Sequence, residues 1–373
     1  MLFRAPIGVL NGLIAVAVAL SPVGVSGLTS AGSLTAWGGG QIGFPAGLTN
    51  IVAISTAIDH SLALSSDGKL VAWGNNFDNQ CDVPADLGPV TGLAAGAFFS
   101  VALKSDGTVA VWGDNQFSQS QVPVDATNVT AISAGRGHVL ALKADTTVRA
   151  WGSDIYGQCD VPSGLSNVVA VLASWNYSLA LRRDGTTVAW GADDAGQTEV
   201  PSGLNGVTAL SGNMEYCLAL KNDGTVVSWG KAPNQPDGLT NIKAIAAGQD
   251  YCLGLTADGT LVAWGANNSG QTNTPTDIGK VSALGAGWNY SVALIPNGVA
   301  PTGFSVLNSI WQAGSFSMLI SGQTNRTYLL QFKQALTDPS WTDLAGVSGS
   351  RKPITLLDPE ATNAHRFYRV REQ

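Results

Sequence analysis

Apolar and polar positions along this chain follow one pattern that is written seven times. Each copy has a V-x-A-[IL] strand, a turn of small residues, an [HYF]-x-[LV]-[AG]-L strand, a turn with Asp or Asn, and a strand ending in Trp-Gly. Alternation with a period of two predicts strands, and the Asp-Gly pairs between the last two predict tight hairpins. The Trp-Gly pairs lie 36, 39, 39, 39, 39 and 35 residues apart and begin at Trp37, Trp73, Trp112, Trp151, Trp190, Trp229 and Trp264.

The repeats carry columns of small residues and one incomplete copy. Ala63 and its equivalents in the second strand are Ala or Gly in all seven copies, which is expected where several sheets converge on one axis. The last copy, residues 280–298, stops before its Trp-Gly strand, whereas Ser33 to Gly39 has a Trp-Gly strand with no preceding pair. The two ends can complete one blade between them. The sequence therefore predicts an all-β fold, a seven-bladed β-propeller closed by the N-terminal strand.

Two stretches carry a family resemblance: WGSDIYGQCDVPSGLSNVVAV, residues 151–171, and GRGHVLALKADTTVRAWG, residues 135–152. They resemble the regulator of chromosome condensation repeat, and the resemblance covers residues 33–298. It implies a seven-bladed propeller closed in the same way. The best-known member of that family is a guanine-nucleotide exchange factor on chromatin. The repeats here are shorter, with no basic tail and no long inserted wedge, so exchange activity is the disfavoured alternative.

The two ends of the chain differ from the repeats. Residues 1–27 have a basic start, an apolar run and small residues suited to cleavage, which predicts a signal peptide. Asn11 and Pro22 interrupt the run that a transmembrane helix would need, so we expect no stable membrane span after cleavage and a secreted, periplasmic or cell-surface location. We assign residues 28–298 to the propeller, 299–303 to a linker and 304–373 to a small accessory β-sandwich. This last part resembles compact C-terminal domains of secreted bacterial proteins.

Charge and cysteine content narrow the function classes. The formal net charge is −7 and no basic stripe is present, so nucleic acid is not an expected partner. Cys81 and Cys159 share one position of the repeat, and Cys217 and Cys252 share another. Because other copies have Ser, Thr or Val there, we expect free thiols, with Cys217–Cys252 as the one bridge worth testing.

Positions that differ between otherwise like copies are free for function. The most variable place is the tip between the first and second strands. By symmetry all seven tips should lie on one face, where large aromatic side chains beside polar ones could bind a protein or a glycan. The alternative is that each tip residue only covers the neighbouring blade. The candidate binding residues are Asp59, Phe98, Arg136, Trp175, Asn176, Glu215, Asp250, Trp288 and Asn289.

Catalytic chemistry has little support in the pattern. The hairpin aspartates read as turn formers, and His60 and His138 share a column with Phe and Tyr, so they read as packing residues. No catalytic triad, metal set or cofactor is expected. Carboxylates at Asp59, Glu215 and Asp250 keep open a polysaccharide-acting hydrolase or lyase. We favour a monomeric, non-catalytic binding or scaffolding protein.

Overall fold

The computed structural model describes residues 32–39, 45, 48–275 and 278–296, and then 305–312, 315–321, 327–333, 340, 342–348, 354–358 and 367–372. The predicted signal peptide and linker lie outside these residues. Contacts divide the chain into one unit of Met1–Thr274 with Val281–Asn297 and another of Pro275–Lys280 with Gly298–Gln373. The boundaries set from the sequence stay a prediction.

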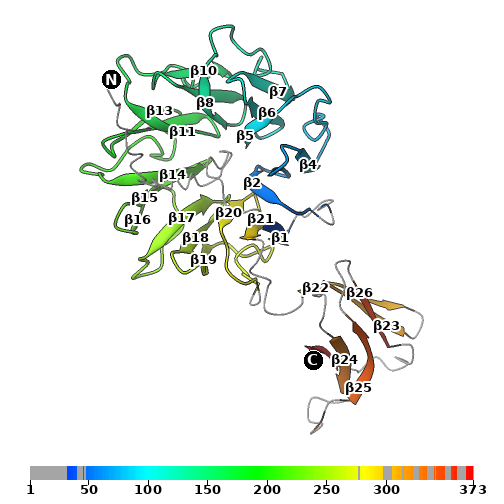
Figure 1. Cartoon of the computed structure of the whole chain (residues 1–373). Coiled ribbons are helices and arrows are strands. Elements are labelled where there is room, and N and C mark those ends of the chain that lie inside the picture. The colour runs from blue at the N-terminus through cyan, green and yellow to red at the C-terminus, as the bar shows by residue number, and fades with distance from the viewer. Residues whose placement is uncertain are drawn as a thin grey trace, which may run out of the picture. The chain divides into compact units, whose positions relative to one another are not determined.

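Every regular element described in the first unit is a strand, as the period-2 pattern predicts. The strands lie around a common centre (Figure 1) as five three-stranded sheets and one six-stranded sheet, β20-β21-β1-β2-β3-β4, in which the pair Gly32–Ile51 joins two sets of three. They are β1 (Gly32–Gly38), β2 (Ile51–Thr56), β3 (His60–Ser65), β4 (Leu70–Gly74), β5 (Val90–Ala95), β6 (Phe99–Lys104), β7 (Val109–Gly113), β8 (Val129–Ala134), β9 (His138–Lys143), β10 (Val148–Gly152), β11 (Val168–Ser174), β12 (Tyr177–Arg182), β13 (Thr187–Gly191), β14 (Val207–Asn213), β15 (Tyr216–Lys221), β16 (Val226–Gly230), β17 (Ile242–Ala247), β18 (Tyr251–Thr256), β19 (Leu261–Gly265), β20 (Ala283–Ala286) and β21 (Tyr290–Pro296).

The N-terminal strand completes the last blade. β1 pairs antiparallel with β21 from Gly32 opposite Pro296 to Gly38 opposite Tyr290. β20 pairs with the other edge of β21, so β20, β21 and β1 have the same arrangement as the other six sets. This is the strand pairing that the incomplete last copy predicts.

The glycine of each Trp-Gly pair is required by a close approach of two backbones. Gly74 has a φ of 111°, and a Cβ there would lie 2.2 Å from the carbonyl oxygen of Asp59 at the hairpin tip. The next residue, Asn75, donates its N–H to that same carbonyl at 2.8 Å. Because only glycine fits this conformation and distance, the outer strand can end against the tip of its own blade.

A backbone carbonyl joins each of several blades to the next. Trp190 donates its indole N–H to the carbonyl of Gln158 in the preceding loop at 2.9 Å, and the Ser178 hydroxyl donates to the same oxygen at 2.8 Å. The indole bond recurs at four other tryptophans, with distances of 2.9 to 3.0 Å: Trp37 to Gln271, Trp112 to Gln80, Trp151 to Gln119 and Trp229 to Gln197. The glutamine side chains are buried. Sequence reasoning missed this glutamine, which stands seven residues after a Trp in five loops.

The column of His, Phe and Tyr at the start of each middle strand is buried, as the packing interpretation predicts. The Tyr216 hydroxyl donates to the carbonyls of Gly248 and Tyr251 in the next blade, both at 2.7 Å. His60 Nε2 lies 3.1 Å from the Ser100 hydroxyl of the next blade. Burial lowers the pKa of His60 to about 4 and that of His138 to about 3, so both rings are neutral and structural.

The hairpin aspartates and the cysteines have structural surroundings. The Asp106 carboxylate accepts hydrogen bonds from the Thr108 hydroxyl and N–H, and these bonds lower its pKa, which fits a turn former. All four cysteines are free. Burial raises the pKa of Cys252 to about 12, and its thiol lies 3.5 Å from the Tyr216 hydroxyl. Cys217 and Cys252 therefore do not form the bridge considered from the sequence.

The second unit contains two three-stranded antiparallel sheets. One has the order β22 (Ser305–Gln312), β23 (Ser315–Ser321), β26 (Ile354–Asp358), and the other β25 (Thr342–Ser348), β24 (Thr327–Lys333), β27 (Phe367–Glu372). Two sheets are what a small sandwich needs, and the sandwich packing itself stays a prediction.

The indole hydrogen bond can be measured because the chain contains its own control. Trp264 is buried like Trp190, but its indole N–H has no hydrogen-bond partner among the described residues. Both Trp190→Phe and Trp264→Phe lose ring volume, while only the first loses a hydrogen bond. We expect Trp190→Phe to lower the free energy of unfolding by about 1 kcal/mol more than Trp264→Phe in urea denaturation. Equal losses would refute the proposed role of the carbonyl.

The buried histidines predict a pH dependence of stability. Their folded-state pKa values lie below the ordinary 6.5, so the unfolded chain takes up protons that the folded chain does not. The stabilising contribution is therefore complete above pH 6.5 and is lost as the pH falls toward 4. We expect the thermal midpoint of the native protein to fall in this window. The variant His60→Phe/His138→Phe, which copies Phe99, should show a clearly flatter profile, and parallel profiles would contradict the account.

Candidate functional site

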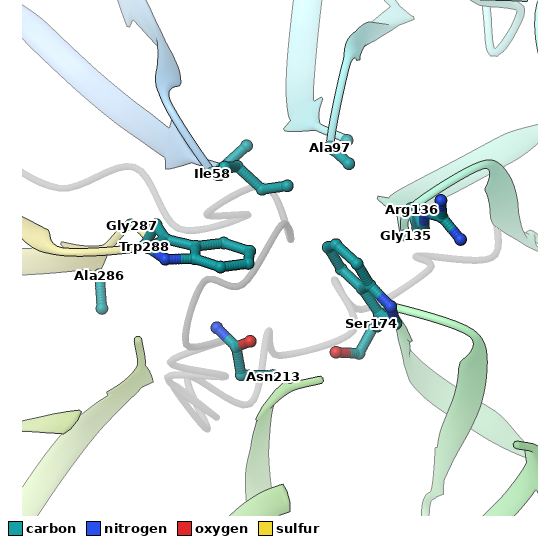
Figure 2. Close-up of a pocket in the computed structure, with 12 residues that line it drawn as sticks. Ile58, Ala97, Gly135, Arg136, Ser174, Asn213, Ala286, Gly287 and Trp288 are labelled. Carbon is teal, nitrogen blue, oxygen red and sulfur yellow. The ribbon is translucent and has the colours of Figure 1, made fainter. Parts of the chain in front are cut away.

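Six of the seven hairpin tips converge on one hollow, which we call the central hollow. The residues that line it from these tips are Ile58, Ala97, Arg136, Trp175, Asn213 and Trp288, with small residues beside them. Figure 2 shows the Trp288 ring and the Asn213 amide reaching into it from different sides. The hollow is shallow and small, with a cavity volume of about 30 Å³, which is room for only one or two water molecules. It can therefore receive no more than a small group that projects from a larger ligand.

Two tryptophans from opposite sides of the ring meet at the hollow. Trp175 follows β11 and Trp288 follows β20, so two blades separate them in one direction and three in the other. Their ring centroids are 6.0 Å apart and the planes are inclined by 57°, a favourable tilted arrangement. The Arg136 guanidinium carbon lies 5.3 Å from the centroid of Trp175. Aromatic surface and one cation are therefore presented together at the centre of the tip face.

Backbone hydrogen bonds between neighbouring tips fix these side chains. The Ala97 N–H donates to Gly135 O at 3.1 Å, and the Arg136 N–H donates to Trp175 O at 2.9 Å. The Trp288 N–H donates to Ile58 O at 3.3 Å, which joins the last blade to the blade that follows β1. The first residue of each of these tips is thereby directed toward the axis. The site is built in advance by the closed ring.

The second residue of each tip has a different role. Its backbone carbonyl accepts the N–H that follows the Trp-Gly pair in all seven copies, as in Phe98 with Asp114 at 3.0 Å. Asp59 also accepts a hydrogen bond from the Asn75 amide at 2.7 Å, and Glu215 forms an ion pair with Lys231 at 3.2 Å. The six candidates that do not line the hollow are Asp59, Phe98, Asn176, Glu215, Asp250 and Asn289.

The structure thus brings together Arg136, Trp175 and Trp288 of the nine candidates. It adds Asn213, which sequence reasoning missed. Asn213 occupies a column that holds Ala, Gly or Ser in the other six copies, as in Gly135 and Ser174, so its size was a readable signal. Its Oδ1 accepts the Met214 N–H at 2.6 Å, which fixes the amide in place.

The hollow offers no acid or base for a hydrolase or lyase. Its lining has no carboxylate, since Asp59, Glu215 and Asp250 all lie outside it. Within the described ranges there is no group of three His, Cys, Asp or Glu that could hold a metal ion. A search of the same residues finds no helix long and apolar enough to cross a membrane. What this arrangement can do chemically is bind, through aromatic surface, an amide and a guanidinium.

Comparison with known proteins gives a family and a fold. The regulator of chromosome condensation repeat matches residues 51–80, 90–119, 129–158 and 242–271. No curated protein matches this chain significantly.

Several solved structures have a similar fold. Prp20p of Saccharomyces cerevisiae, studied for its binding to Gsp1p and histones, is 18% identical, with 75% of this chain and 93% of Prp20p covered and a TM-score of 0.60. Yeast RCC1 (Prp20) in complex with Kap60 is 19% identical, with 79% of this chain and 94% of that chain covered and a TM-score of 0.62. The ectodomain of the Physcomitrella patens receptor kinase CR4 is 20% identical, with 69% of this chain and 75% of that chain covered and a TM-score of 0.54. The solved structures show the propeller fold, and the four matched stretches show that the chain carries regulator of chromosome condensation (RCC1) repeats.

Proposed function

We propose that this chain is a secreted, non-catalytic binding or scaffolding protein that holds a group of a protein or glycan partner in the central hollow. The observation that carries the proposal is the meeting of Trp175 and Trp288, contributed by two distant blades, beside Arg136 and Asn213. Tryptophan and arginine are the residues most often found at the energetic centre of binding surfaces. Secretion rests on the sequence of residues 1–27, and the C-terminal unit is proposed as an accessory or attachment module.

A protein partner has additional support from the comparisons. Prp20p was studied with Gsp1p and histones, and yeast RCC1 was solved with Kap60, so propellers of this fold bind other proteins. The hydrolase or lyase alternative has no carboxylate in the hollow to support it. Guanine-nucleotide exchange is not proposed, because the predicted signal peptide and the short repeats disfavour it.

The test uses the two tryptophans and the residues next to them. The chain without residues 1–27 is screened against a glycan array and used to capture cell-surface proteins. The affinity of each partner found is then measured for Trp175→Ala and Trp288→Ala. We expect each variant to bind about 10- to 100-fold more weakly, because each removes a large aromatic contact at the centre of the site.

The controls are Asn176→Ala and Asn289→Ala, which alter the adjoining tip residues outside the hollow. They should bind within about threefold of the native protein. Unchanged thermal midpoints would show that all four variants are folded. If both tryptophan variants keep full affinity for every partner, the central hollow is not the binding site.

A further inference from the structure

Exposed apolar side chains are concentrated on three consecutive loops of the propeller. Phe77 is 92% exposed, Ile155 70% and Tyr156 49%, and Phe117 in the loop between them is half-buried. They lie in the loops that follow β4, β7 and β10. We call these four residues the aromatic sector. Large side chains this exposed are uncommon on a soluble protein unless they take part in binding.

The aromatic sector lies on the same face as the central hollow. The first residue of each of these loops donates its N–H to a tip carbonyl, as Asp114 does to Phe98 and Ser153 to Gly137. The Phe117 ring packs so closely on Gly137 that a Cβ there would lie 2.6 Å from the ring. Gly137 follows Arg136, whose guanidinium lies over Trp175. The aromatic sector is therefore continuous with the hollow and extends from it over three neighbouring blades.

The loops after β13 and β19 lack this feature. The position of Phe77 and Ile155 is occupied by Asp194 in the loop after β13 and by Asn268 in the loop after β19. The backbone of these loops is nevertheless the same, since the buried glutamine fixes each one. Tyr156 N–H donates to Gln158 Oε1 at 2.8 Å, and Ala195 N–H to Gln197 Oε1 in the copy without aromatics. The same loop backbone thus presents apolar side chains after β10 and polar ones after β13.

Charge around the aromatic sector indicates the chemistry of its partner. The segments 75–82, 114–121 and 153–160 contain no Lys or Arg, and they contain five aspartates: Asp78, Asp82, Asp114, Asp154 and Asp160. None of the five belongs to an ion pair among the described residues. Arg136, the charged residue of the hollow, lies at the inner end. A partner over the outer loops therefore meets aromatic rings surrounded by unpaired negative charge.

We propose that the aromatic sector and the aspartates around it bind a basic polypeptide segment, in which Lys or Arg alternates with apolar residues, while the central hollow holds an adjoining group. Cationic side chains can lie over Phe77, Phe117 and Tyr156 and also approach the carboxylates, whereas acidic polymers are repelled. This inference rests on the proposed function and makes the partner a protein that lies off the axis, over the blades that contain β4, β7 and β10.

The first experiment measures peptide binding by fluorescence anisotropy at 50 and 300 mM NaCl. The probes are labelled peptides of repeated Lys-Leu-Ser and of repeated Glu-Leu-Ser. The protein is produced from the complete sequence, residues 1–373. We expect the Lys peptide to bind, with an affinity that falls as salt rises, and the Glu peptide to bind at least tenfold more weakly.

The deciding variant is Phe77→Ser/Ile155→Ser/Tyr156→Ser, which changes exposed side chains and leaves the loop backbone bonds intact. It should weaken the Lys peptide at least tenfold, whereas Asn268→Ser, at the equivalent loop position, should change affinity less than twofold. Asp78→Asn/Asp154→Asn should reduce the salt dependence. An unchanged Lys-peptide affinity in the triple variant overturns the inference, because binding would then come from net charge alone.

Other occupants give different results. If the native protein self-associates in sedimentation and the triple variant does not, the surface binds a second copy. If the native protein binds neutral glycans on an array and the triple variant does not, the surface binds sugar. Either result overturns the inference. A partner that needs Trp175 and Trp288 but tolerates the triple variant would refute the aromatic sector and leave the proposed function standing. A partner indifferent to all of these changes would refute both.

Discussion

Five pairs of neighbouring blades are held together by a backbone carbonyl in the connecting loop. A three-stranded sheet cannot bury enough apolar surface alone, so it is stable only between two neighbours. The glutamine carbonyl meets this need because it accepts the indole N–H and, in several copies, a hydroxyl of the following blade, as at Gln158 with Trp190 and Ser178. Trp37 makes the same bond to Gln271 although the two lie at opposite ends of the repeat region. With the pairing of β1 and β21, this bond closes the ring.

The closed ring explains how side chains far apart in the sequence reach one place. At the tips of Ala97, Arg136 and Trp288 the first residue lines the hollow and bonds to its neighbour, and in all seven tips the second residue accepts the bond from the Trp-Gly strand. Substitution at either position leaves these backbone bonds in place. The chain can therefore vary its tips without altering its blades, and Trp175, Trp288 and the aromatic sector are places where one copy departs from the others.

Most of the fold could be predicted from the sequence because the repeat states it seven times. The spacing of the Trp-Gly pairs predicted the number of blades. The Trp-Gly strand at Ser33 to Gly39, which has no preceding pair of strands, predicted the partner of β21. The site could be predicted only in part. Variation between copies identified Trp175 and Trp288, but their 6.0 Å separation depends on distances across the ring, which a sequence does not contain. The sequence also could not show that Asp59 and Glu215 lie outside the hollow. Their backbone carbonyls accept the N–H groups of Asn75 and Lys231, and this bond depends on the folded blade. Asn213 and the buried glutamines could have been identified from their positions in the repeat, but sequence reasoning missed them. The signal peptide and the identity of the partner stay predictions.

The central claim is that Trp175 and Trp288 act as one binding site because the ring brings them into contact. A double-mutant cycle on partner affinity tests it most directly, comparing the native protein, Trp175→Ala, Trp288→Ala and the double variant. Contact between the rings predicts a coupling free energy of about 0.5–1.5 kcal/mol. Losses that simply add would contradict the account, since they would mean that the two tryptophans bind independently.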